Sequence, residues 1–68
     1  MDAVLEAENT VRELRAALAR AGVTLPSLAL DLLSVARDEP APLVDLGRCT
    51  PHVARRLAAL AAKGGADV

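Results

Sequence analysis

Apolar residues recur along the first part of the chain with alternating spacings of three and four, and they form the stripe Val4, Ala7, Val11, Leu14, Leu18 and Ala21. This spacing places all of them on one face of a helix and predicts an amphipathic helix over residues 2–21. No Gly or Pro interrupts the pattern before Gly22, which is expected to end the helix at the C′ position.

The apolar stripe of this helix has two possible partners. It can pack against the rest of its own chain, or it can also pair with the same helix of a second copy. Fewer than three heptads is short for an independent coiled coil, so the pattern leaves both alternatives open. If the stripe pairs with a second copy, the candidate interface residues are Val4, Ala7, Val11, Leu14 and Leu18.

Residues 27–37 are compatible with two local structures. Helix propensity favours a short helix with Ser27 as its N-cap. The preceding Val23-Thr24-Leu25 run is β-prone, and Pro26 restricts Leu25 to extended conformations. Propensity therefore does not decide between a helix and an extended segment.

A proline-rich turn is predicted at residues 38–42, where Asp-Glu-Pro-Ala-Pro interrupts any regular pattern. The run Leu43-Val44-Asp45-Leu46 that follows is apolar, ends at Gly47 and is too brief for a helix, so it predicts a strand. Two extended arms around this turn would form a β-hairpin within residues 23–47.

A second helix is predicted over residues 50–63. Thr50 is a good N-cap, Pro51 takes the favoured first helical position, and Gly64 and Gly65 should stop the helix and begin a frayed tail over residues 64–68. Its buried stripe is expected to be Val53, Ala54, Leu57, Leu60 and Ala61. Its candidate basic face consists of Arg48, His52, Arg55, Arg56 and Lys63.

These elements predict a single small α+β domain that is mostly helical: an N-terminal helix, a short β-hairpin and a C-terminal helix. The alternative is an all-α fold of three short helices. The chain has 68 residues, and a domain of that size buries only a modest core. Cys49 is its only cysteine, so an intramolecular disulfide cannot add stability, and association with a second chain is the expected source of extra core.

Composition narrows the possible functions. Ala, Val, Leu, Met and Cys make up 53% of the chain, which is too apolar for disorder, and aromatic residues for stacking on bases are absent. The net charge of -1 gives no overall attraction to DNA or an anionic membrane. With no leader-like start and no apolar run longer than Leu57 to Ala62, we expect a cytoplasmic protein.

Candidate chemistry is sparse. Cys49 and His52 have a C-x-x-H spacing, but two ligands do not complete a zinc site. The carboxylates Asp31, Asp38, Glu39 and Asp45 fall in loop or strand, with no spacing that pairs them for acid/base work. The sequence therefore predicts no catalytic, cofactor or metal residue, no enzymatic activity and no small-molecule substrate.

Two resemblances bear on the fold. The runs Thr24 to Leu28, Pro42 to Cys49 and Ala54 to Ala58 resemble a group of short proteins from high-GC actinobacteria that has no established function. The group often has Gly and Pro where this chain has Ala29 to Leu32, which implies an extended middle segment. This resemblance favours the helix, hairpin, helix arrangement and implies no activity.

The second resemblance covers Leu46 to Leu60, which is similar to the turn and recognition helix of winged helix-turn-helix repressors. It implies that His52, Arg55 and Arg56 face the major groove, with Arg48 and Lys63 near phosphates. However, a helix of about two turns should precede the tight turn, and only Leu43 to Leu46 separates Pro42 from Gly47. The sequence therefore predicts a protein-interaction or regulatory module, acting as a homodimer or with a protein partner, with a DNA-binding regulator as the alternative.

Overall fold

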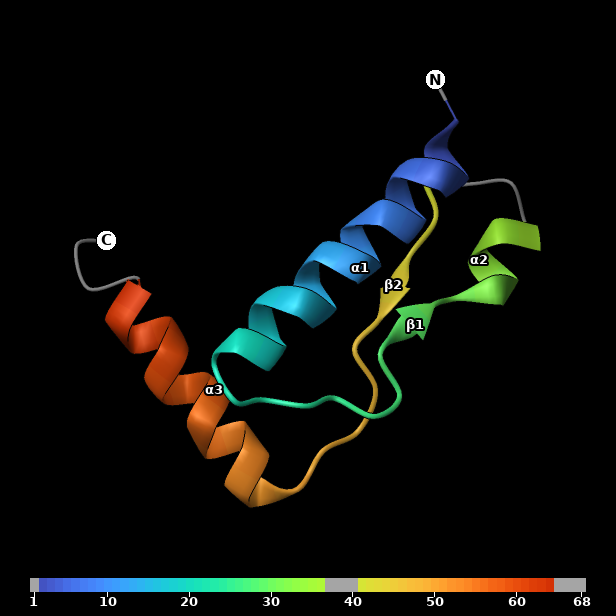
Figure 1. Ribbon diagram of the computed structural model, residues 1–68. Helices are drawn as coiled ribbons and strands as arrows, with labels where there is room; N and C mark the ends of the chain where they lie inside the picture. Colours follow the sequence, from blue (N-terminus) through green and yellow to red (C-terminus); the bar gives the residue numbers. More distant parts are fainter. Residues whose placement is uncertain (1, 37–40, 65–68) are drawn as a thin grey trace.

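A computed structural model of the chain describes residues 2–36 and 41–64. Its elements, in chain order, are α1 (Ala3–Arg20), β1 (Ala29–Leu30), α2 (Leu32–Ala36), β2 (Val44–Asp45) and α3 (Pro51–Gly64) (Figure 1). The two strands pair antiparallel, with Ala29 opposite Asp45 and Leu30 opposite Val44. The predicted α+β fold of helix, hairpin and helix is confirmed.

Helix α1 begins one residue later than predicted because Asp2 is its N-cap. An Asp2 side-chain oxygen accepts hydrogen bonds from the backbone N–H groups of Val4 and Leu5, at 2.9 and 3.4 Å. These N–H groups have no partner inside the helix, and the capping carboxylate accepts their hydrogen bonds. Its negative charge is also stabilised by the positive end of the helix dipole.

The C-terminal end of α1 is closed by a Schellman motif. Gly22 has a φ of 77° and its N–H donates to the carbonyl of Ala19 at 3.0 Å, while the Val23 N–H donates to Leu18 at 2.8 Å. The two residues that bracket the motif, Leu18 and Val23, are both buried. The prediction that Gly22 occupies C′ is confirmed, and the motif turns the chain back beneath α1.

The predicted hairpin lies within residues 23–47, but its first strand does not include the β-prone run at 23–25. Leu25 accepts a 3.2 Å hydrogen bond from the Leu28 N–H and closes a turn with Pro26 and Ser27 at its centre. Ser27 therefore caps no helix, and the first arm of the hairpin is β1 instead. Pro at the second position of a turn is favoured because its φ is already fixed.

Residues 27–37 contain both structures that propensity left open, since β1 is followed directly by the short helix α2. The Asp31 carboxylate accepts from the Leu33 N–H at 3.0 Å and so caps α2 in place of Ser27. The predicted turn at 38–42 falls partly on residues 38–40, which lie outside the described residues.

Ser34 joins α2 to the start of β2. Its hydroxyl donates to the Asp31 carbonyl at 2.6 Å and accepts from the Leu43 N–H at 2.8 Å. The Asp31 N–H in turn donates to the Leu43 carbonyl at 2.8 Å. Ser34 is buried, so this three-residue network replaces water for groups that would otherwise be left unsatisfied.

Helix α3 begins as predicted. The Thr50 hydroxyl accepts from the Val53 N–H at 3.2 Å, and Pro51 is the first helical residue. The helix continues through Gly64, one residue past the predicted end, so Gly64 is not part of a frayed tail. The other tail residues, 65–68, lie outside the described part of the chain.

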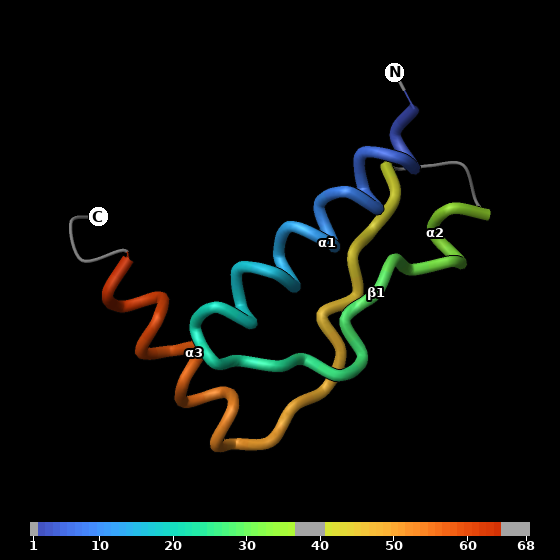
Figure 2. The backbone as a smooth tube through the Cα atoms, viewed as in Figure 1, coloured from blue at the N-terminus to red at the C-terminus, as the bar shows by residue number. Residues whose placement is uncertain are grey.

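The core lies between α1 and residues 23–47, which contain the hairpin and which we call the hairpin segment. Its buried side chains are Val11, Leu18, Val23 and Leu28, and half-buried side chains pack around them, namely Leu14, Leu25, Val44, Val53 and Leu57. Helix α3 passes beside the C-terminal end of α1, and its own C-terminal end extends away from α1 (Figure 2). No residue of α3 reaches full burial.

Candidate functional site

The apolar stripe of α1 packs mainly inside its own chain. Val11 and Leu18 are each 6% exposed and belong to the core, Leu14 packs against it, and Val4 and Ala7 are half-buried. The hairpin segment therefore covers the central and C-terminal parts of the stripe. The intermolecular role predicted for these five residues stays a prediction, and the large exposed apolar side chains lie elsewhere.

Three of those exposed side chains surround the Ser34 network. Leu32 and Leu33, at the start of α2, are 76% and 68% exposed, and Leu43, just before β2, is also exposed. The bonds from Ser34 and Asp31 to Leu43 keep these residues together. We call Leu32, Leu33 and Leu43 the α2 patch.

A second apolar surface lies at the other end of the molecule, between the end of α1 and the outer half of α3. This groove has a volume of about 300 Å³ and is lined by Ala21, Arg56, Ala59, Leu60 and Lys63. We call it the α3 groove. Its apolar floor is Leu60, which is exposed, with Arg56 and Lys63 on the same helix beside it.

The residues of the predicted basic face lie in different surroundings. Its five side chains, Arg48, His52, Arg55, Arg56 and Lys63, are all exposed. The Arg56 guanidinium, however, donates to the Ala21 carbonyl at 3.4 Å, next to the Schellman turn, so it ties α3 to the end of α1. Cationic groups at a helix C-terminus are favoured by the dipole.

Arg48 is separated from the other basic residues by its place before α3. It lines a shallow hollow of about 520 Å³ with Thr24, Pro26, Cys49, Thr50 and Val53. The segment before this hollow is the strand β2, whereas a helix-turn-helix needs a helix there. The geometry therefore places Arg48 at one hollow and Arg56 with Lys63 at another, and a strand rather than a helix precedes the loop before α3.

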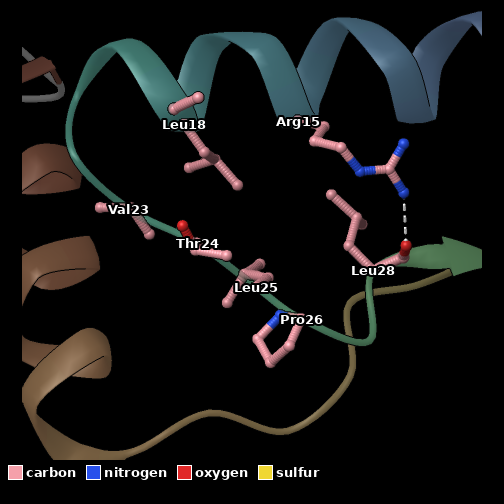
Figure 3. A pocket seen from close by; sticks show the side chains of 8 residues that line it. Arg15, Leu18, Val23, Thr24, Leu25, Pro26 and Leu28 are labelled. Carbon is pink, nitrogen blue, oxygen red and sulfur yellow. Dashed lines mark hydrogen bonds between the residues drawn. The ribbon is translucent and has the colours of Figure 1, made fainter.

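Arg15 has a structural role that the sequence did not reveal. Its guanidinium donates to the Leu28 carbonyl at 2.7 Å and crosses a small apolar hollow between α1 and residues 23–28 (Figure 3). The hollow has a volume of about 170 Å³, below the roughly 300–1,000 Å³ typical of ligand pockets. Arg15 therefore fastens α1 to the hairpin segment and does not mark a ligand site.

Groups for catalysis or metal binding do not converge in the described ranges 2–36 and 41–64. Cys49 and His52 are both exposed, and no three His, Cys, Asp or Glu side chains come close enough there to hold a metal ion. The Asp31 and Asp45 carboxylates accept backbone hydrogen bonds from Leu33 and Gly47. Among the same residues, no helix combines the length and the apolar character needed to span a bilayer.

The chain matches no family model, no curated protein and no solved structure. The resemblances to short actinobacterial proteins and to winged helix-turn-helix repressors therefore stay predictions. The α2 patch and the α3 groove are the surfaces on which a functional proposal can rest.

Proposed function

We propose that this protein is a non-enzymatic protein-interaction module that acts as a homodimer. The observation that carries the proposal is the position of four of its large exposed apolar side chains, three of them at the α2 patch and Leu60 in the α3 groove. Exposed apolar side chains that gather in this way often mark a place where another protein docks.

The energetics of a small core support association. Among the described residues, four apolar side chains form the buried core, and none of them is aromatic. Burying one exposed leucine contributes about 1.5–3 kcal/mol, a large fraction of the stability of a domain this small. Contact with a second copy would cover leucines that the chain alone leaves in water.

Protein rather than DNA is the proposed partner for two reasons. Arg48 lies at one hollow and Arg56 with Lys63 at another, so these cations are divided between two surfaces. The overall charge of -1 also gives no long-range attraction to a polyanion. A regulatory role through a different protein partner remains compatible with the same surfaces.

The solution mass of the chain, measured by light scattering over a tenfold concentration range, tests the proposal. We expect the mass of a dimer, and we expect Leu33→Glu to shift the mass toward the monomer because a carboxylate then replaces an exposed leucine of the α2 patch. Ala16→Glu, on an exposed position of α1, is the matched control and should leave the dimer intact. A monomeric wild-type chain at every concentration would contradict the proposal.

A further inference from the structure

Charge is segregated along the chain in a way that matches the two apolar surfaces. Residues 23–47 contain four acidic residues and one basic residue, whereas residues 48–63 contain four basic residues and no acidic one. The α2 patch belongs to the acidic segment, and the α3 groove is formed mainly by the basic one. Oppositely charged surfaces steer association and fix its register.

The rims of the two surfaces show the same complementarity. Asp31 directly precedes Leu32, and the exposed Asp45 follows Leu43 by two residues, so two acidic residues neighbour the α2 patch along the chain. Their carboxylates accept backbone hydrogen bonds from Leu33 and Gly47 and contribute negative charge to this part of the molecule. In the α3 groove, Arg56 and Lys63 stand beside the exposed Leu60. One surface is thus apolar with an acidic rim, and the other is apolar with a basic rim, which is the usual anatomy of two halves of one interface.

The two surfaces of one chain do not meet. Helix α2 and the outer half of α3 lie at opposite ends of the molecule, separated by the length of α1 (Figures 1 and 2). Val53 and Leu57 pack on the core, and Arg56 bonds to Ala21, so α3 is held at its own end. The partner of each surface must therefore come from another molecule.

Resting on the proposed homodimer, we infer that the α3 groove of one copy receives the α2 patch of the second copy, and that the contact occurs twice around a two-fold axis. Pairing α3 with α3 would set Arg56 and Lys63 against the same cations, and pairing α2 with α2 would set carboxylates against carboxylates. The reciprocal arrangement brings opposite charges together at both contacts and closes the assembly at two copies.

A complementation experiment with two variants tests this pairing. Leu60→Glu places a carboxylate in the α3 groove, and Leu32→Lys places an ammonium group on the α2 patch, where the native side chain is 76% exposed. Each variant alone forms two disrupted contacts, so its dimer dissociation constant should rise about 30-fold or more. When the two variants are mixed, one contact is native and the other joins the new carboxylate to the new ammonium group.

Native mass spectrometry of each variant and of the equimolar mixture gives the readout. We expect monomers from each variant alone and a heterodimer from the mixture. Leu46→Glu, at an exposed leucine outside both surfaces, is the matched control and should stay dimeric. Circular dichroism of every variant confirms that its helices are retained.

The possible outcomes separate this inference from the proposed function. If Leu32→Lys alone stays dimeric, α2 is outside the interface, and if Leu60→Glu alone stays dimeric, the α3 groove is outside it; either result overturns the pairing while the homodimer stands. A mixture that remains monomeric also overturns it. A monomeric wild-type chain would instead remove the homodimer itself.

Discussion

At the scale of single residues, Gly47 occupies a position that no other residue fits without strain. Its φ is 76°, and a Cβ added there would lie 2.5 Å from the Cβ of Ser27. The loop before α3 thus packs directly on the turn at residues 25–28, and any side chain at position 47 would meet both backbone strain and a clash.

We therefore expect Gly47→Ala to lower the free energy of unfolding by about 1–3 kcal/mol. Chemical denaturation followed by circular dichroism measures this change as a lower midpoint. Gly64→Ala is the control, because a Cβ there meets nothing within 4 Å and the residue is helical. That substitution should be neutral or should add up to about 1 kcal/mol, and a loss at position 64 equal to that at 47 would contradict the explanation.

Local signals in the sequence were sufficient for the residues that act on their neighbours. Gly22, Thr50 and Pro51 end or begin helices through bonds that span a few residues, so the sequence alone predicted their roles. Arg15 and Arg56 instead donate to carbonyls 13 and 35 residues away. Those partners depend on the tertiary fold, and no local pattern specifies them.

At the scale of elements, the Ser34 hydroxyl connects the short helix α2 to the rest of the fold. A helix of five residues is too short to be stable alone, and Ser34 is its buried residue. The hydroxyl bridges Asp31 and Leu43, so it fixes both the start of the helix and its position beside β2.

Ser34→Ala should therefore destabilise the chain by about 1–3 kcal/mol, because the Leu43 N–H loses its partner in a place that water reaches poorly. Amide hydrogen exchange at Leu43 is the most direct measurement. We expect the substitution to accelerate exchange of the Leu43 N–H more than exchange of the amides in α1. Ser27→Ala, at an exposed serine, is the control and should change neither quantity measurably. Unchanged exchange at Leu43 in the Ser34 variant would count against this account.

The same segment shows why the long helices were predicted more accurately than the short elements. The two long helices carry several turns of periodic pattern, and the sequence predicted their ends to within one residue. Residues 27–37 contain a two-residue strand and a five-residue helix, each too short for a period to register. Their boundary is set by Asp31, whose bonds to Leu33 and Leu43 combine local capping with a contact across the hairpin.

At the scale of the whole molecule, the sequence left the cover of the α1 stripe open and predicted a buried stripe on α3. That second prediction is wrong at Ala54, Leu60 and Ala61, which are exposed, while Val53 and Leu57 are half-buried. Periodicity identifies a helix face and says nothing about what packs on it. In the structure the hairpin segment covers the α1 stripe, while Leu60 of α3 remains exposed. The candidate interaction surface was therefore not predictable from spacing, and it follows only from the arrangement of the elements.

If association covers these leucines, thermal stability should depend on protein concentration. Mass action favours the folded dimer over unfolded chains, so the melting temperature of the wild-type chain should rise by a few degrees for a tenfold increase in concentration. Differential scanning calorimetry at two concentrations checks this. The Leu32→Lys variant should melt at the same temperature at both concentrations, and a wild-type chain with that behaviour would rule out linked folding and association.

The brevity of the two strands limits the kinds of assembly open to this chain. Each strand spans two residues, so either free edge of the hairpin offers an incoming strand only a very short row of backbone groups. Natural proteins use such short edges to discourage strand-by-strand aggregation. Within the described residues, addition of a strand to this hairpin is therefore a poor route to larger assemblies, and the exposed leucines offer a different one in the pairing that we propose.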